Sequence, residues 1–110
     1  MLTYSEKRTV AREVVELLVA GDGEQLGQRS TPEMRQVLGG RRKASRLWSR
    51  AIRAKGAYAG IEAQLYTPED AEHFQADLTL GFERGSVRVR VAIDDDGLIN
   101  GLVIRPGDWR

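Results

Sequence analysis

The chain has 110 residues, a formal net charge of +1, 41% hydrophobic residues and 30% charged residues. This composition is typical of one globular domain with a single core over residues 1–110, and it is too apolar for a disordered chain. A net charge near zero gives no overall field that would attract nucleic acid or a membrane. The absence of cysteine excludes disulfides, thiolate zinc sites and a cysteine nucleophile.

The sequence also bears on location. The N-terminal residues lack the apolar core of a signal peptide, and no stretch approaches the roughly 18 apolar residues needed to span a membrane. We therefore expect a cytoplasmic protein with no membrane contact.

The first half of the chain has the periodicity and the end signals of α-helices. A first helix begins after a capping box of Thr3 and Glu6, and Gly21 ends it. Pro32 is placed at the first turn of another helix, where its missing N–H has no intrahelical partner in any case. The predicted helices span residues 4–20, 23–29, 32–38 and 41–55.

After Gly56 the period changes from 3.6 to 2, which predicts strands. In three segments the apolar side chains share one face: Ala57, Ala59, Ile61, Ala63 and Leu65; Phe74, Ala76, Leu78, Leu80 and Phe82; Val87, Val89, Val91 and Ile93. In a fourth segment Leu98, Leu102 and Ile104 share a face, although Ile99 and Val103 blur the pattern. Helices followed by an antiparallel meander predict an α+β domain with the helices packed on one sheet face.

Several blocks of sequence carry a resemblance to a known superfamily. They are residues 11–22, 31–35, Trp48, 80–85 and 91–106, the last reading Val-Ala-Ile-Asp-Asp-Asp-Gly-Leu-Ile-Asn-Gly-Leu-Val-Ile-Arg-Pro. In order and spacing they resemble the nuclear transport factor two-like (cystatin-like cone) superfamily. Within it they look most like a family of uncharacterised small domains that are often fused to α/β-hydrolases of the serine aminopeptidase type.

The resemblance implies a particular architecture. This is a cone, in which a curved four-stranded antiparallel sheet wraps around three to four helices, with a pocket between the two layers. It also implies a hydrolase as one partner, and pairing of two copies through the outer surface of the sheet. It carries over no catalytic residue and no cofactor.

The concave side of the sheet is the candidate ligand pocket. An apolar cleft with few polar groups is a typical small-molecule site, so an apolar small molecule is the expected ligand. Alternatively, the same side chains fill one another as core, and the sequence leaves both interpretations open. The lining residues are Trp48, Phe74, Leu78, Leu80, Phe82, Val89, Val91 and Leu102.

An enzymatic alternative depends on the register of the first strand. Isomerases and dehydratases of the superfamily use a buried carboxylate or histidine with a tyrosine or acid that holds an oxyanion. On the predicted register the inward strand positions are all apolar, which predicts no catalytic residue. A one-residue slip or a bulge would turn Tyr58, Glu62 and Tyr66 inward and create a carboxylate–tyrosine pair.

Two charged surfaces are further candidates. Segment 41–55 carries seven positive charges and no negative one, and Arg42, Arg46, Arg50 and Arg53 follow near-helical spacing. Such a stripe suits an anionic partner, or it is a solvated face; the low net charge argues against nucleic acid. On the outward sheet face, Arg88 and Arg90 lie near Asp77 and Glu83, which predicts either a cross-strand charge ladder or a homodimer interface.

The only histidine, His73, follows the acidic residues Glu69, Asp70 and Glu72. A zinc site usually needs three or four ligands, so the sequence predicts no metal site here. We therefore expect a non-enzymatic binding or accessory domain, homodimeric and without a cofactor.

Overall fold

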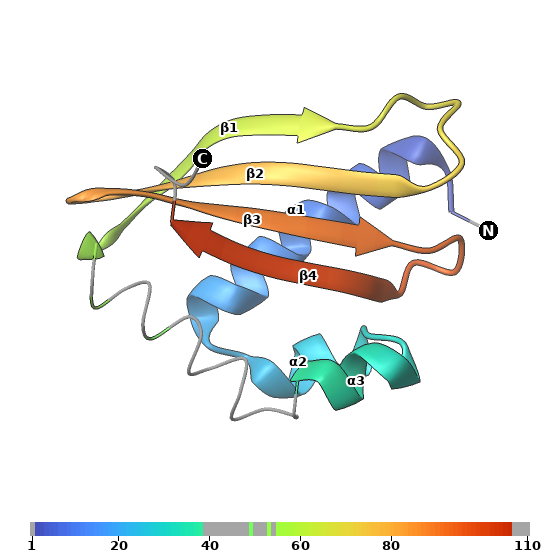
Figure 1. Ribbon diagram of the computed structural model, residues 1–110, viewed down its shortest axis with the longest axis horizontal. Coiled ribbons are helices and arrows are strands. Elements are labelled where there is room, and N and C mark those ends of the chain that lie inside the picture. Colours follow the sequence, from blue (N-terminus) through green and yellow to red (C-terminus); the bar gives the residue numbers. More distant parts are fainter. Residues whose placement is uncertain (1, 39–48, 50–52, 54, 107–110) are drawn as a thin grey trace.

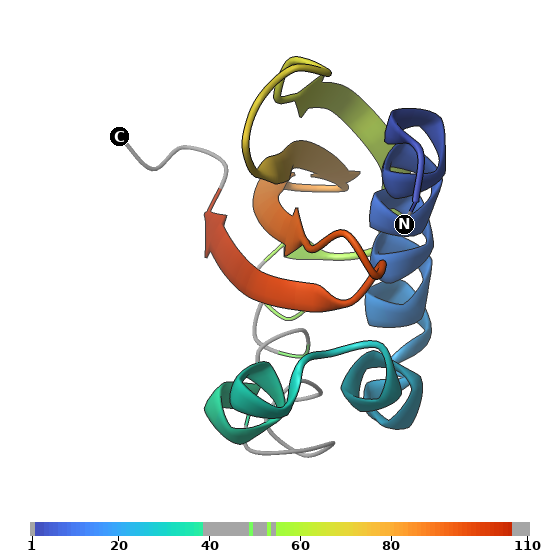
Figure 2. The same cartoon turned by 90° about the vertical axis from the view of Figure 1, so that its right-hand side faces the viewer.

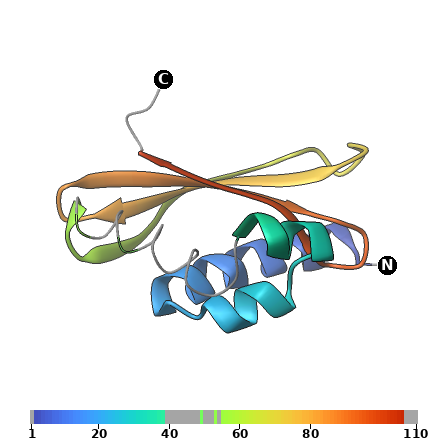
Figure 3. The same ribbon diagram turned by 60° about the horizontal axis from the view of Figure 1, so that its bottom comes forward.

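The computed structural model describes residues 2–38, 49, 53 and 55–106. In this part of the chain, helices precede strands: α1 (Tyr4–Ala20), α2 (Gly23–Gln28), α3 (Pro32–Leu38), β1 (Tyr58–Tyr66), β2 (Phe74–Phe82), β3 (Gly85–Ile93) and β4 (Ile99–Pro106). The strands form one antiparallel sheet in chain order (Figure 1). The helices lie on one side of this sheet (Figure 3). The α+β class predicted from the sequence is confirmed.

Helix α1 has both predicted ends. The hydroxyl of Thr3 accepts the Glu6 backbone N–H (3.1 Å), and the Thr3 backbone N–H donates to the Glu6 carboxylate (3.0 Å). At the other end Gly21 adopts a φ of 71°, which a glycine reaches without strain. The buried residues Ala11, Val14, Val15 and Leu18 form the stripe that faces the sheet. Through this stripe α1 packs against β2 and β3.

The connection between α2 and α3 is fastened to the sheet. Asp22 and Thr31 cap the two helices with side-chain oxygens that accept backbone N–H groups. Between the helices, Ser30 forms a parallel bridge with Ile99 at the start of β4. The Ile99 backbone N–H donates to the Arg29 carbonyl (2.6 Å), so α2 and α3 are held beside β4 (Figure 2). The fourth predicted helix, 41–55, lies mostly outside the described residues.

Strands β2 and β3 form a ladder without irregularity, from Phe74 opposite Ile93 to Phe82 opposite Gly85. Side chains alternate across it: Leu78 and Val89 are fully buried on the side of the helices, whereas their neighbours along each strand lie on the other side. The faces predicted for these two strands are therefore correct.

The face predicted for β1 is correct at Ile61 and wrong at Ala63 and Leu65, which lie on the other side of the sheet. The pairing of β1 with β2 shifts register between Tyr58 and Gly60 and again between Ile61 and Ala63. Each irregularity adds a residue and exchanges the faces of the residues beyond it. As a result Tyr58, Ile61 and Tyr66 pack against the core, whereas Leu65 is 70% exposed.

The face predicted for β4 needs a similar correction. Ile93 lies opposite Ile99 and Ala92 opposite Gly101, so Asn100 is an extra residue in β4. Ile99 is fully buried, and Leu98 precedes the strand and is only half-buried. Leu102 and Ile104 are half-buried against the core, as their predicted face requires.

The core lies between α1, α2 and the inner face of the sheet. Its largest fully buried side chains include Leu18, Leu26, Leu78, Leu80 and Ile99. Full burial of one such side chain contributes about 1.5–3 kcal/mol. Among the described helices, none is long and apolar enough to cross a membrane. The cytoplasmic location expected from the sequence stays a prediction.

The two faces of the sheet predict different costs for the same substitution. Leu78→Ala removes a fully buried side chain, and we expect it to lower the free energy of unfolding by about 2–5 kcal/mol. Leu65→Ala, the matched control on an exposed position, should change it by less than about 0.5 kcal/mol. Urea unfolding of dilute protein measures both. Equal losses for the two variants would contradict the observed register of β1.

Candidate interaction surface

The side of the sheet that faces away from the helices, here called the outer face, carries two rows of side chains that cross all four strands. Each row consists of residues that lie directly opposite one another on neighbouring strands. One row contains Leu65, Asp77, Arg90 and Val103, and the next contains Ala63, Thr79, Arg88 and Arg105. A hollow of about 420 Å³ lies over these rows.

An ion pair occupies the centre of the first row. The Nε of Arg90 donates to Oδ1 of Asp77 at 2.8 Å, across the β2–β3 ladder. This hydrogen bond, together with the charge of Asp77, raises the pKa of Arg90 above its ordinary value. The pair confirms one rung of the predicted cross-strand ladder. Glu83, predicted near it, instead lies 3.8 Å from Arg84 in the turn after β2.

Apolar side chains flank this ion pair. Leu65 on β1 and Val103 on β4 are 70% and 39% exposed, and both line the hollow. Exposed apolar side chains gathered in a depression are a feature of interaction surfaces. The sequence pattern assigned Leu65 to the core, and only the bulges of β1 place it on the outer face.

Arg88 and Arg105 face each other directly across β3 and β4. Like charges at such positions destabilise a sheet. Within the described part of the chain neither guanidinium forms an ion pair with a carboxylate. The second row therefore has an excess of positive charge beside the neutralised pair of the first row.

The residues predicted to line an apolar pocket belong to the core. Phe74, Leu78, Leu80, Phe82, Val89 and Val91 are buried in one cluster, and Leu102 packs against it while half-buried. Trp48 lies outside the described residues. The described members contact one another on the inner face, which agrees with the core interpretation; a ligand at this position stays a prediction.

The carboxylate–tyrosine pair of the enzymatic alternative is not formed, because the bulges put its members on opposite faces. Tyr58 lies on the inner face with its ring edge-on to Phe82 (5.6 Å), and burial together with the charge of Glu16 raises its pKa. Glu62 lies on the outer face, where a Cβ added to Gly81 would be 2.4 Å from Oε1 of Glu62. Tyr66 also faces inward and its hydroxyl donates to the Gln64 side chain (2.6 Å).

The basic stripe can be followed at one position only. Arg53 is exposed and has helical backbone. Arg42, Arg46 and Arg50 lie outside the described residues, so an anionic partner for the stripe stays a prediction.

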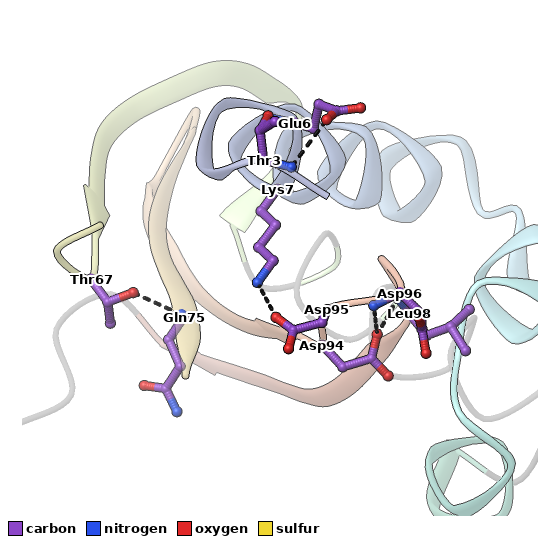
Figure 4. Close-up of polar contacts among 9 residues, drawn as sticks. All are labelled: Thr3, Glu6, Lys7, Thr67, Gln75, Asp94, Asp95, Asp96 and Leu98. Atoms are coloured by element: carbon purple, nitrogen blue, oxygen red, sulfur yellow. Dashed lines mark hydrogen bonds and ion pairs between the residues drawn. The ribbon is translucent and has the colours of Figure 1, made fainter. Parts of the chain in front are cut away.

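A second hollow, of about 430 Å³, lies at the end of the sheet near the start of α1. Nζ of Lys7 lies 2.7 Å from Oδ1 of Asp95, and the Asp94 carboxylate accepts the backbone N–H groups of Asp96 and Leu98 (Figure 4). These bonds hold the turn between β3 and β4 as a hairpin. His73, which also lines this hollow, is exposed and 3.9 Å from Glu72. Among the described residues, no three potential ligand side chains are grouped so that they could hold a metal ion.

Comparisons with known proteins give no match to any family model, curated protein or solved structure. The resemblance to the nuclear transport factor two-like superfamily therefore stays a prediction.

The Lys7–Asp95 pair predicts a pH dependence. The hydrogen bond and charge of Lys7 lower the pKa of Asp95 below its ordinary value of 3.8. The pair therefore stabilises the fold above pH 3.8, and its effect is lost as the pH falls through the lower pKa of the folded chain. In Lys7→Met, the titration midpoint of Asp95, followed by the NMR shift of its carboxyl carbon, should rise toward 3.8.

The matched control for this experiment is Arg12→Met, which removes another cation of α1. Arg12 has no carboxylate partner in the described chain. Its replacement should leave the Asp95 midpoint where it is. An unchanged midpoint in Lys7→Met would contradict the ion pair.

Proposed function

We propose that this chain is a non-enzymatic interaction domain that forms a homodimer through the outer face of its sheet. The observation that carries the proposal is the row in which Leu65 and Val103, both exposed, flank the Asp77–Arg90 pair. An apolar–charged–apolar row over a hollow is suited to burial against another protein surface.

The partner proposed is a second copy, because this row is complementary to itself. A two-fold axis parallel to the strands and between β2 and β3 lays β1 of one copy over β4 of the other. Leu65 then meets Val103 of the second copy, and Asp77 meets Arg90 of the second copy. Such an isologous contact of two stacked sheets is a common form of homodimer.

The superfamily assignment is part of the proposal. We infer that the sheet and helices form a cone of the nuclear transport factor two-like kind. Helices that precede a four-strand meander and lie on one side of it support this inference (Figure 2). An apolar ligand between the two layers and a hydrolase partner are further expectations of the same assignment.

Leu65→Asp tests the dimer. A charge introduced into the apolar contact should raise the dimer dissociation constant about tenfold or more, since central apolar positions dominate interface energetics. Sedimentation equilibrium over a wide range of protein concentration measures this constant. The position is 70% exposed in one chain, so circular dichroism should show an unchanged fold.

The control is Gln36→Asp, which adds the same charge at an exposed position of α3, on the side of the helices. It should leave the dissociation constant within about twofold of the original protein. Wild-type protein that stays monomeric at every concentration, or equal effects of the two variants, would refute the proposed function.

A further inference from the structure

In the described chain, charges without ion-pair partners occur in the second row of the outer face and beside it. Arg88 and Arg105 lie opposite each other on β3 and β4. On the same face, toward the β1 edge of the sheet, the exposed carboxylate of Glu62 lies over Gly81 of β2. Within the described residues none of these three side chains belongs to an ion pair. The surface thus holds an excess positive charge and an excess negative charge that do not meet within one chain.

The second of the two bulges of β1 sets the position of Glu62. Ile61 pairs with Leu80 and Ala63 with Thr79, so Glu62 is the extra residue between these pairs. Glu62 and Ala63 consequently lie on the same side of the strand. Glu62 therefore lies beside Ala63, the β1 end of the row whose β4 end is Arg105, and its carboxylate lies over Gly81 in the adjoining row.

The two possible in-plane two-fold axes treat these charges differently. An axis across the strands, between the two rows, would place Arg90 over Arg88 of the second copy, bringing like charges together. The axis parallel to the strands places each row over the same row of the second copy, with the order of the strands reversed. It brings Ala63 over Arg105 of the second copy, so that the neighbouring Glu62 lies close to Arg105 and Arg88 of that copy.

The distances suit such a contact. Stacked sheets lie about 10 Å apart and are turned by about 30° relative to each other. Glutamate and arginine side chains are long enough to meet across this gap, and the guanidinium group can bind a carboxylate with two parallel hydrogen bonds.

From this arrangement we infer that Glu62 of each copy binds Arg105 and Arg88 of the other, and that this pairing fixes the register of the homodimer. The inference rests on the proposed homodimer and specifies its contacts. By symmetry the contact occurs twice, once at each end of the interface. One carboxylate then lies between the like charges of Arg88 and Arg105 and offsets half of their positive charge.

A charge exchange tests the contact. Arg105→Glu and Glu62→Arg should each raise the dimer dissociation constant about tenfold or more, because like charges then face each other across the interface. The double variant Arg105→Glu/Glu62→Arg restores opposite charges and should return the constant to within about threefold of the original. The effect of each single variant should shrink as salt concentration rises.

Two controls separate the contact from changes in net charge and in folding. The double variant Arg35→Glu/Glu24→Arg exchanges the same charges at exposed positions on α3 and α2, and it should not change the dissociation constant. Arg105→Glu also places a carboxylate opposite Arg88 in the same chain, so the thermal stability of the monomer should not fall. A weaker dimer in this variant therefore cannot be ascribed to unfolding.

The outcomes distinguish the two proposals. Protein that is monomeric throughout refutes the homodimer and the inference with it. A dimer that Leu65→Asp dissociates, but that the single charge variants leave intact, retains the proposed function and overturns the Glu62 contact. Weakening by the single variants without recovery in the double variant also overturns it, since the acid that neutralises Arg105 then comes from elsewhere.

Discussion

The unbroken ladder between β2 and β3 is the constraint on which the rest of the structure depends. It runs from Phe74 opposite Ile93 to Phe82 opposite Gly85 and sorts each residue onto one of two faces. A slip of one residue would bring Asp77 and Arg88 against α1, and removing such charges from water costs several kcal/mol each. The register is therefore strongly specified, and both the core and the outer face inherit it.

The sequence predicted the fold best where its pattern is regular. Apolar residues alternate without interruption through β2 and β3, and α1 has a capping box at one end and a glycine at the other, so these elements were predicted with the correct faces. In β1 and β4 a bulge interrupts the alternation. A bulge has only a weak signature in the sequence. Gly60, which has a φ of 118°, is consistent with a bulge, but from the sequence alone a glycine is equally consistent with a turn. These irregularities explain why Ile99 is buried in the core in place of Leu98, and why Leu65 is exposed.

The candidate site shows the same division. Asp77, Arg88 and Arg90 belong to the regular strands, and their place on the outer face was predictable. Leu65 and Glu62 belong to the bulged strand. The predicted register already placed Glu62 outward, whereas the exposure of Leu65 was not predictable. Periodicity also cannot tell a packed core from a lined cavity, because both require the same apolar side chains on the same face. The structure brings Leu78, Leu80, Val89 and Val91 together with no exposed surface, which the sequence could only offer as one of two interpretations.

The features of the outer face gain a common explanation in a stacked dimer. In a single chain the exposure of Leu65 is of no benefit, the opposition of Arg88 and Arg105 is unfavourable, and Glu62 has no ion-pair partner in the described chain. A face that only met water could repeat the Asp77–Arg90 pair in the next row, and instead that row has arginines at both of its β3 and β4 positions. Reversing one copy of the face over another supplies the missing partner in each case: Val103 for Leu65, and a carboxylate for the two arginines. The second bulge of β1 is central to this arrangement, because its extra residue is Glu62, which lies on the outer face, and because it shifts Leu65 out of the core.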